Sequence, residues 1–517
     1  MRHRGLMRIA TVGVLTVTAL LLTTGTAFAS STDAGGTTTE ELTHGDISMN
    51  LLWIVIGAAL VIFMQAGFAL VETGFCRAKH AAHVVTTNLA IFGLGFVGYY
   101  AVGFGLMFGG FSYSLFGMNE PIGSALIGSG NWVFLWKGGF FLQGGAYDVS
   151  VLAFFLYMVA FMDTTATIPT GSMAERWKWN SFAIWGLFCG AIYYPLFGAW
   201  TWGGGWLAKL GETVGWGNGY VDFAGSGIVH MTGGVAALAG ALVLGPRIGK
   251  YGPDGKPRTL AAHSIPMAMT GTFILLFGWF GFNAASTFAA TDHRFAVVAA
   301  NTAIAGAFGL VLSMVWVQLR TPKHQPDPGM IANGLLAGLV AITAPCAFVQ
   351  PYAAAIIGTI AGVLVVEAVW FIEKRGIDDP VGAVSVHGIC GCLGVISVGL
   401  FADGVYGEGW NGTEGTVKGL FYGGGAGQLL AQLAGALTIA TVMFGLAYAF
   451  FAIQNAVTKG GIRPTAETEL DGLDLEEMGV LAYPEFYGSS KYVELLGPDG
   501  EPIEIPEPVA VGQERSR

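Results

Sequence analysis

Two histidines stand inside apolar stretches of this chain, each within a similar short phrase. The phrases V-H-M-T-G-G at 229–234 and V-H-G-I-C-G at 386–391 both place a glycine four residues after the histidine. An ionisable side chain in a segment long enough to cross a bilayer is costly, so it marks a pathway or a relay. Because imidazole nitrogens can accept, donate or carry a proton, His230 and His387 are candidates for such a relay; a histidine satisfied within the core is the alternative, which two histidines at matched places disfavour.

Asp222 stands eight residues before His230, at the head of the same glycine-rich stretch. At a rise of about 1.5 Å per residue, the two side chains lie about 12 Å apart along a helix axis. A carboxylate at this place can cap the helix by accepting backbone N–H groups at the positive end of the helix dipole. We expect Asp222 mainly to cap the helix, with a secondary electrostatic attraction for cations.

Cys390 and Cys392 follow His387 closely, and histidine and cysteine together can bind soft metals. On a helix of about 3.6 residues per turn, positions 390 and 392 point roughly 200° apart, so the three side chains do not converge. The other three cysteines are scattered among or beside the apolar stretches. The sequence therefore predicts no metal site, no disulfide framework and no cofactor.

The composition indicates the class of protein. Of 517 residues, 53% are hydrophobic and only 11% are charged, and the mean hydropathy is +0.60. These values exclude a soluble protein and, together with repeated apolar runs of bilayer length, indicate a polytopic membrane protein. The 80 glycines suit helices that approach one another closely. The net charge of -10 says little about partners, because the acids concentrate near the N-terminus and in the C-terminal tail.

The first 29 residues have the pattern of a secretory signal peptide. A basic start is followed by an apolar run from Ile9 to about Leu22 and by A-F-A at 27–29. We expect cleavage after Ala29, which leaves a polar extracellular segment over 30–49. An uncleaved first helix is the alternative, but the run is short and no stop-transfer pattern follows it.

Eleven apolar segments come next, and they predict an all-α membrane domain over 50–454, followed by a tail over 455–517. The expected spans are approximately 50–72, 86–112, 149–171, 180–201, 223–246, 264–289, 295–318, 329–349, 353–373, 381–402 and 426–454.

The charges in the connecting loops indicate the orientation. With the mature N-terminus outside, the cytoplasmic loops carry 14 basic residues and the extracellular loops carry four. The cytoplasmic residues are Arg77, Lys79, Arg176, Lys178, Arg247, Lys250, Lys256, Arg258, Arg320, Lys323, Lys374, Arg375, Lys459 and Arg463, and the extracellular ones are Lys137, Lys209, Arg294 and Lys418. This bias follows the positive-inside rule and predicts an extracellular N-terminus and a cytoplasmic C-terminus.

Five spans followed by five more, each group with a histidine in its last member, indicate an internal duplication. An odd number of spans per repeat puts the two halves in opposite orientations. This is the inverted-repeat plan of many transporters, in which the substrate site lies at the repeat interface. We expect an inverted 5+5 repeat plus one helix.

Seven phrases, in order along the chain, resemble those of one family. They are F-M-Q-A-G-F-A-L-V-E-T-G-F at 63–75, D-T-T-A-T-I-P-T-G-S-M-A-E-R at 163–176, W-G-G-G at 202–205, D-F-A-G-S-G-I-V-H at 222–230, G-W-F-G-F-N-A-A-S at 278–286, G-L-V-A-I-T-A at 338–344 and D-D-P-V-G-A-V-S-V-H-G-I-C-G at 378–391. The stretch from Leu51 to about Phe486 thus resembles the ammonium transporter, methylammonium permease and Rhesus protein family. The resemblance implies a homotrimer of eleven-helix protomers in the plasma membrane, each with a narrow hydrophobic pore for ammonium uptake.

The family's outer ammonium site falls on Phe161, Trp202 and Ser286, and its stacked aromatic gate falls on Phe161 and Phe282. Ring faces attract a cation by cation–π interaction, worth about 2 kcal/mol or more when the cation is desolvated, and the serine hydroxyl can accept an N–H. Without the surrounding phrases, packing or interface anchoring would be the better explanation of these aromatic residues.

Binding the ion does not conduct it. Moving a bare ion into an apolar pore costs on the order of 20 kcal/mol in the Born limit and several after relaxation, so the cation must shed its proton. The resemblance places the paired pore histidines at His230 and His387, with Asp222 at the outer end of the fifth span. Ammonia is then expected to cross while the histidines relay the proton. Tyr157 and Met158 depart from the Phe and Gln frequent in the family, which changes the shape of the outer vestibule.

The tail carries an acidic phrase at 465–486. In the family a similar phrase lies under the trimer and takes part in control by PII signalling proteins, although Met478 stands where histidine is frequent. A solvated tail without a partner is the alternative, and the polar, Pro-rich stretch beyond Gly488 is expected to be a mobile extension. Asn411-Gly412-Thr413 is a glycosylation sequon in a loop expected outside.

Other functions are weighed against ammonium transport. An ammonium sensor is expected to carry a signalling domain after its last span, which the tail does not resemble. A Rhesus-type channel for NH3 or CO2 is expected to have a degraded outer site, whereas Phe161, Trp202 and Ser286 are all present. An enzyme requires a nucleophile–base pair or a trio of metal ligands, and none is recognised. The favoured interpretation is an ammonium transporter that is not an enzyme.

Overall fold

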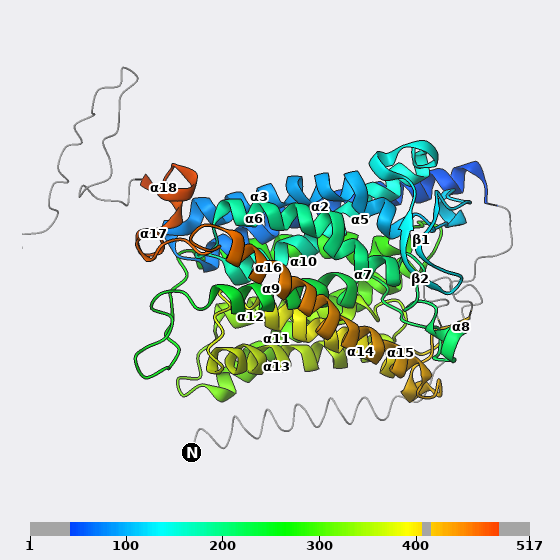
Figure 1. Cartoon of the computed structure of the whole chain (residues 1–517). Coiled ribbons are helices and arrows are strands. Elements are labelled where there is room, and N and C mark those ends of the chain that lie inside the picture. Colours follow the sequence, from blue (N-terminus) through cyan, green and yellow to red (C-terminus); the bar gives the residue numbers. More distant parts are fainter. Residues whose placement is uncertain (1–41, 406–414, 485–517) are drawn as a thin grey trace, which may run out of the picture.

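The computed structural model describes residues 42–405 and 415–484. Its long helices lie side by side between two ends of the molecule (Figure 1). Strands β1 (Ser124–Ser129) and β2 (Trp132–Lys137) lie at one end, here called the hairpin end, and α17 (Ala466–Asp471) and α18 (Leu473–Met478) lie at the opposite end, the tail end. The expected signal peptide at 1–29, most of the segment expected at 30–49, the sequon at Asn411 and the extension beyond residue 484 fall outside the described residues.

Ten helical segments among the described residues are long and apolar enough to cross a membrane. They are α2 (His44–Phe75), η1 to α4 (Ala78–Phe108), α5 (Val149–Met173), α6 to α7 (Trp179–Trp200), η7 with α9 (Ser226–Leu244), α10 to η9 (Ile265–Thr287), α11 (Arg294–Arg320), α13 (Pro351–Lys374), η10 with α14 (Val384–Phe401) and α15 to α16 (Gly427–Val457). The expected span 329–349 corresponds to a shorter helix of 16 residues, α12 (Pro328–Thr343). The expectation of a helical, multi-pass membrane protein is confirmed.

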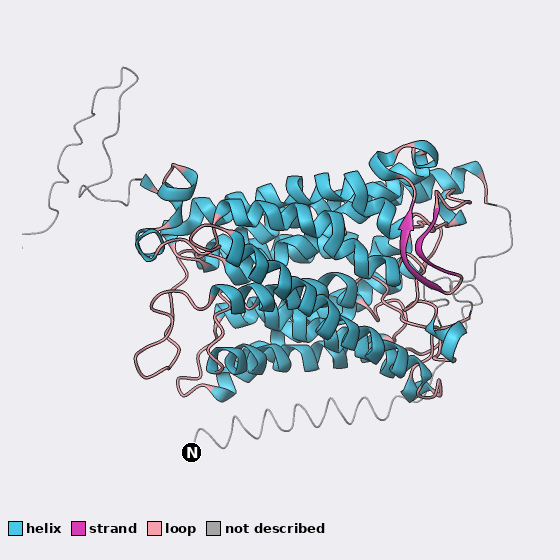
Figure 2. Ribbon diagram, viewed as in Figure 1, coloured by secondary structure: helices cyan, strands magenta, loops and turns pink. Residues whose placement is uncertain are grey.

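Short helices occupy the connections (Figure 2). They are η3 (Ser114–Phe116), η4 (Phe140–Leu142), η5 (Gly144–Ala146), α8 (Leu210–Val214) and η11 (Leu420–Tyr422).

Polar caps set where the membrane helices begin. The Thr43 hydroxyl accepts the backbone N–H of Asp46 at 3.2 Å, and the Asp46 carboxylate accepts that of Thr43 at 2.9 Å, which forms a capping box. Helix α2 therefore begins at His44 and not at residue 50. In the same way, the Asp148 carboxylate accepts the N–H of Ser150 at 2.9 Å at the start of α5.

One connection contains a short β-hairpin, which the expected all-α fold did not include. Strands β1 and β2 pair in an antiparallel hairpin between the second and third membrane segments (Figure 2). Gly130, with φ +54°, stands in the turn. The backbone N–H of Trp206 donates to Val133 at 3.1 Å, and the Trp200 indole donates to Phe134 at 3.0 Å, so the hairpin is anchored to the fourth segment and its following loop.

Two π-helical turns cross at the centre of the bundle. They are η7 (Ser226–Met231), at the start of α9 (Thr232–Leu244), and η10 (Val384–Ile389), at the start of α14 (Cys390–Phe401). A Cβ added to Gly234 would lie 2.2 Å from the nitrogen of Gly388, and one added to Gly391 would lie 2.5 Å from the oxygen of Ser226. Only glycine permits this approach, so the glycines of the two V-H phrases bring the histidine segments into contact.

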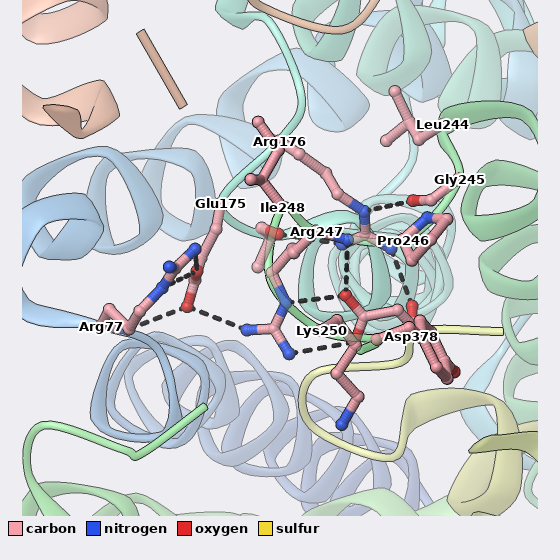
Figure 3. Close-up of polar contacts among 12 residues, drawn as sticks. Arg77, Glu175, Arg176, Leu244, Gly245, Pro246, Arg247, Ile248, Lys250 and Asp378 are labelled. Atoms are coloured by element: carbon pink, nitrogen blue, oxygen red, sulfur yellow. Dashed lines mark hydrogen bonds and ion pairs between the residues drawn. The ribbon is translucent and has the colours of Figure 1, made fainter. Parts of the chain in front are cut away.

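A buried cluster of charged residues joins the loops at the tail end (Figure 3). Arg247 donates to the Glu175 carboxylate at 3.0 Å and to both oxygens of Asp378 at 2.8 and 3.0 Å. Arg77 donates to Glu175 at 2.6 Å, and Arg176 donates to the backbone oxygen of Asp378 at 2.7 Å. These loops follow the first, third and fifth of the ten membrane segments and precede the ninth, so the cluster ties together parts of the chain distant in sequence.

The neighbouring cations keep both acids of this cluster ionised. Burial by itself would raise the pKa of Glu175, but Arg247 and the other nearby cations hold it at about 2. Burial acts in the same direction on Asp378, yet the guanidinium groups of Arg176 and Arg247 keep its pKa well below the usual range.

The described part of the tail packs against the loops of the tail end. The Asp474 carboxylate accepts the backbone N–H groups of Ala82 and His83 at 3.0 and 2.8 Å, which caps the start of α3 (Ala81–Gly98). The Glu469 carboxylate accepts the N–H of Ile248 at 2.7 Å. The alternative of a solvated tail is therefore wrong for these residues, because two acids of the acidic phrase are bound within the chain.

Candidate functional site

His230 and His387 meet where η7 and η10 cross. Their Nδ1 atoms lie 3.1 Å apart, their ring centroids lie 5.2 Å apart, and both residues are buried. A hydrogen bond at this distance requires that one Nδ1 carries a proton and the other does not. The pair can therefore hold one proton between two acceptors. Within the described part of the chain, Nε2 of His230 has no hydrogen-bond partner, which leaves it available to a small polar molecule.

Asp222 holds the start of η7 at the hairpin end. Its carboxylate accepts the backbone N–H groups of Gly225, Gly227 and Ile228 at 3.0, 2.8 and 2.8 Å. Three N–H donors at a helix start satisfy groups that have no partner within the helix. The immediate consequence is a fixed direction for the backbone that carries His230.

Asp379 does the same for η10 from the tail end, and sequence reasoning missed this residue. Its carboxylate accepts the N–H groups of Ala383 and Val384 at 3.0 and 2.7 Å. Asp379 precedes His387 by eight residues, as Asp222 precedes its own histidine. The repeated D-x7-H spacing is the signal that could have found it. The two capped segments enter from opposite ends and place their histidines in contact.

An aromatic column leads to the histidine pair. The rings of Phe161 and Phe282 are stacked with centroids 4.1 Å apart and planes 28° apart. The ring of His230 lies 5.3 Å from that of Phe282 and is stacked on Trp279 at 5.1 Å. The ring of Phe282 thus contacts both the gate residue Phe161 and the imidazole of His230, so aromatic faces lead up to the histidine pair.

A small cavity lies on the hairpin side of this column. Its volume is about 20 Å³, enough for one molecule the size of water. Trp202, Ser286 and Met158 contribute to its lining, the remainder of which is Phe108, Phe111, Phe154, Phe223 and Phe288. The structure brings Trp202 and Ser286 together at this cavity. Phe161 does not line it, but its ring packs edge-on against Trp202 at 5.8 Å.

Tyr157 completes the surroundings of Ser286. The two hydroxyl groups lie 3.1 Å apart, and the Ser286 hydroxyl donates to the backbone oxygen of Phe282 at 2.7 Å. Because that proton is already engaged, Ser286 presents lone pairs and can accept an N–H from a ligand. In the sequence, Tyr157 stood out only as a departure from the family pattern. Its contact with the Ser286 hydroxyl comes from the structure.

The thiols near His387 have separate surroundings. Cys390 Sγ lies 3.9 Å from the backbone oxygen of Ala361, whereas Cys392 lines an apolar cavity. Over the described residues, no group of three or more His, Cys, Asp or Glu side chains could hold a metal ion.

Residues 52–483 match the model of the Ammonium Transporter Family. This chain belongs to the ammonium transporter family. It is 44% identical over 478 residues to ammonium transporter Amt2 of Archaeoglobus fulgidus, which covers 92% of this chain and 96% of that relative. It is 34% identical over 465 residues to ammonium transporter Amt1 of Haloferax mediterranei, over 87% of this chain and 81% of the relative.

Solved structures of this family have the same fold. A structure titled Sensor Amt Protein superposes with a TM-score of 0.72 at 36% identity, covering 84% of this chain and 98% of that one. The crystal structure of Mep2 from Candida albicans gives 0.69 at 28% identity, covering 86% and 93%. The ammonium transporter family is a family of membrane transport proteins and not an enzyme class.

Proposed function

We propose that this chain is an ammonium transporter that binds NH4+ at an outer aromatic site, removes one proton, and conducts NH3 and the proton separately. The main observation behind this proposal is the distance of 3.1 Å between the Nδ1 atoms of the buried His230 and His387. An apolar pore excludes an ion, but a pair of imidazoles that shares one proton can pass that proton on.

The outer site recruits the cation. The indole of Trp202 offers a ring face for cation–π attraction, and Ser286 offers acceptor lone pairs, both at a cavity for one water-sized molecule. Below it, Phe161 and Phe282 act as a gate that must part, since their stacked rings at 4.1 Å block the path. Asp222 fixes the helix that carries His230 and adds a negative charge at the outer end.

Orientation follows from the basic loops. The tail end holds Arg77, Arg176 and Arg247, and the hairpin end holds Lys137 and Lys209. By the positive-inside rule, the tail end is cytoplasmic and the hairpin end extracellular. We place the protein in the plasma membrane, with the inverted repeat meeting at the histidines and uptake directed toward the tail end.

Assembly and control are further parts of the proposal. We expect a homotrimer with one pore per protomer, and control by a PII signalling protein at the tail. The docking of Asp474 and Glu469 on the cytoplasmic loops supports a route by which a bound protein could influence the pore. The tail would then regulate, while selectivity would stay with the pore.

The test is electrical current in proteoliposomes on stepping to ammonium or potassium at fixed pH. Potassium has the charge and size of ammonium but no proton to release, so the native protein should pass current with ammonium and none with potassium. His230→Asp or His387→Asp introduces a fixed carboxylate that offsets part of the desolvation cost of a bare cation, so each should pass potassium.

An apolar replacement of both histidines is the matched control. It should abolish proton-coupled current without opening a path for potassium. Potassium current in the native protein equal to the ammonium current would show that ions cross intact, and the relay would have to be abandoned.

A sensor role is the second candidate, because one similar structure is titled a sensor. A Rhesus-type gas channel is the third, but Trp202 and Ser286 at the outer cavity favour capture of a cation. Sustained ammonium-evoked current would favour transport, and ammonium binding without flux would favour sensing. Flux of NH3 or CO2 without charge movement would favour the gas channel.

A further inference from the structure

Glu72 is an acidic side chain inside α2 that the proposed mechanism does not use. The residue is only 2% exposed and stands in the last turn of the helix, toward the tail end. A buried acid in a membrane segment is costly, so it needs either firm partners or a role in moving charge.

The carboxylate of Glu72 has defined partners on two other membrane segments. Asn88 donates to it at 2.7 Å, and the Thr170 hydroxyl lies 2.9 and 2.8 Å from its two oxygens. The network continues, because Thr167 donates to Asn88 at 3.0 Å and Gln65 donates to Thr167 at 3.0 Å. Polar side chains of α2, α3 and α5 thus form one connected group around a carboxylate.

This group lies beside the inner part of the pore. The ring of Phe68 is 6.2 Å from the ring of His387. Gln65, Phe68 and Glu72 follow one another at spacings of three and four residues, so they share a face of α2. Glu72 therefore stands one turn, about 6 Å, beyond the contact with His387 on the way to the tail end.

The segment that carries His387 also lies near Glu72, because both border Gly171 of α5. A Cβ added to Gly171 would lie 3.1 Å from a carboxylate oxygen of Glu72 and 2.6 Å from a methyl group of Val381. Asp379 lies two residues before Val381 in this segment. Burial raises the pKa of Asp379 to about 6, although backbone N–H donors oppose the shift. A second acid at the inner end can thus exchange a proton near neutral pH.

We propose that Glu72 is the proton acceptor on the cytoplasmic side of the histidine pair, an inference that rests on the proposed transport mechanism. An N–H bond of the protonated pair breaks and an O–H bond forms on the Glu72 carboxylate, with an intervening water to bridge the helical turn. The O–H bond then breaks toward cytoplasmic water, which restores the carboxylate. Ammonia leaves separately, so the proton and the substrate recombine only in the cytoplasm.

The competing explanation is that Glu72 only ties α2 to its neighbours. Glu72→Gln distinguishes the structural explanation from the proton-acceptor explanation. The glutamine side chain has nearly the same volume and its amide oxygen still accepts from Asn88, but it no longer takes up a proton. Glu367→Gln is the matched control. Glu367 lies on α13, accepts the indole N–H of Trp316 at 2.8 Å and pairs with Arg320 at 3.2 Å, with 40% of its side chain exposed.

The experiment uses the full chain in proteoliposomes and measures two quantities. Ammonium-evoked current reports the proton, and alkalinisation of the vesicle interior under an ammonia gradient reports NH3. Glu72→Gln should lower the current about a hundredfold, the lower end of what a positioned acid or base contributes, and should leave NH3 entry unchanged. Glu72→Asp should recover part of the current with a shifted pH dependence. Glu367→Gln should match the native protein in both measurements.

Undiminished current in Glu72→Gln would overturn the proposal. Equal loss of current and NH3 entry in folded Glu72→Gln would identify Glu72 as a structural tie and would overturn it as well. Should Glu72→Gln fail to fold, Glu72→Asp carries the test, and a native pH dependence of its current would count against Glu72. Absence of ammonium current in the native protein would instead refute the transport mechanism itself.

Discussion

At the residue scale, the outer site combines aromatic ring faces with a few polar groups that already form hydrogen bonds within the protein. Ser286 donates to a backbone oxygen and so presents acceptor lone pairs, and Trp202 is oriented by donating its indole N–H to the backbone oxygen of Asp222 at 2.7 Å. The indole is therefore fixed with its polar edge engaged. Its ring face is what remains for a cation.

Replacing Trp202 with leucine should weaken ammonium capture. Loss of about 1–2 kcal/mol of cation–π attraction would raise the half-saturating ammonium concentration about five- to thirtyfold. The measurement is the concentration dependence of the ammonium-evoked current. Trp316→Leu, on α11 away from the cavity, is the control and should leave that concentration unchanged. Native affinity in a folded Trp202→Leu protein would remove the outer site from the mechanism.

At the element scale, the two histidine segments are held together by glycines and held in direction by aspartates. The backbone at the start of α9 packs against that of η10 with no side chain between them, because Gly234 and Gly388 face one another. Asp222 and Asp379 cap the two segments from opposite ends. A shift of either segment would therefore change the contact between the histidine nitrogens.

Gly234→Ala tests this crossing. The new Cβ would lie 2.2 Å from a backbone nitrogen, so the segments must separate, and the protein should lose about 3 kcal/mol or more of stability, at the upper end for overpacking. Gly93→Ala, in α3, is the matched control, because its Cβ would meet nothing within 4 Å. Thermal unfolding in detergent compares them. Equal melting temperatures for the two variants would contradict the crossing.

The charged cluster at the tail end predicts a dependence of stability on pH. Glu175 has a pKa of about 2 in the folded protein and 4.5 as its ordinary value. A depressed pKa stabilises the fold above pH 4.5, and this stabilisation, on the order of 3 kcal/mol, is lost as the pH falls from about 4.5 to about 2. Glu175→Gln should be less stable than the native protein at pH 7.

The unfolding temperatures of the native protein and of Glu175→Gln, each measured at pH 7 and at pH 3, give the contribution of the Glu175 carboxylate to stability. The native protein should lose more stability than Glu175→Gln over that range, since the variant has no carboxylate to protonate and already leaves Arg247 without one partner. Parallel pH profiles for the two proteins would show that Glu175 does not contribute in this way.

At the scale of the whole molecule, the hairpin end and the tail end have different tasks. The outer cavity lies on the hairpin side of the aromatic column, whereas the tail end carries the charged cluster (Figure 3) and the tail helices α17 and α18 (Figure 1). Tyr483 extends the docking, because its hydroxyl lies 3.0 Å from Nε2 of His263. A change in the tail can therefore reach the loops without touching the pore.

Deletion of Leu481 to Arg517 should separate regulation from conduction. It removes the contact of Tyr483 with His263 but none of the pore residues. PII binding, or inhibition that depends on a PII protein, should change, while the preference for ammonium over potassium should stay native. The measurements are a binding assay and current in proteoliposomes. Loss of ion discrimination in the deletion would contradict this division.

The membrane class, the helical spans and the family were predictable from the sequence, because each depends on patterns within short stretches. Apolar runs of bilayer length predict membrane helices wherever they occur, and the phrases around His230 and His387 identify the family without knowledge of their contact. Boundaries were less predictable. The capping box of Thr43 and the docking of Asp474 at Ala82 extended helices beyond their apolar runs.

Tertiary structure alone decided which polar groups meet. Glu72 and Thr170 stand 98 residues apart in the sequence, and Asp474 caps a helix 392 residues before it, so no local pattern reports these contacts. The burial of Glu72 was likewise invisible, since its place near the end of an apolar run is equally compatible with exposure to water. Packing three helices around one carboxylate gave that residue its partners. Such partners depend on the spatial arrangement of distant segments, which the spacing of residues along the chain does not specify.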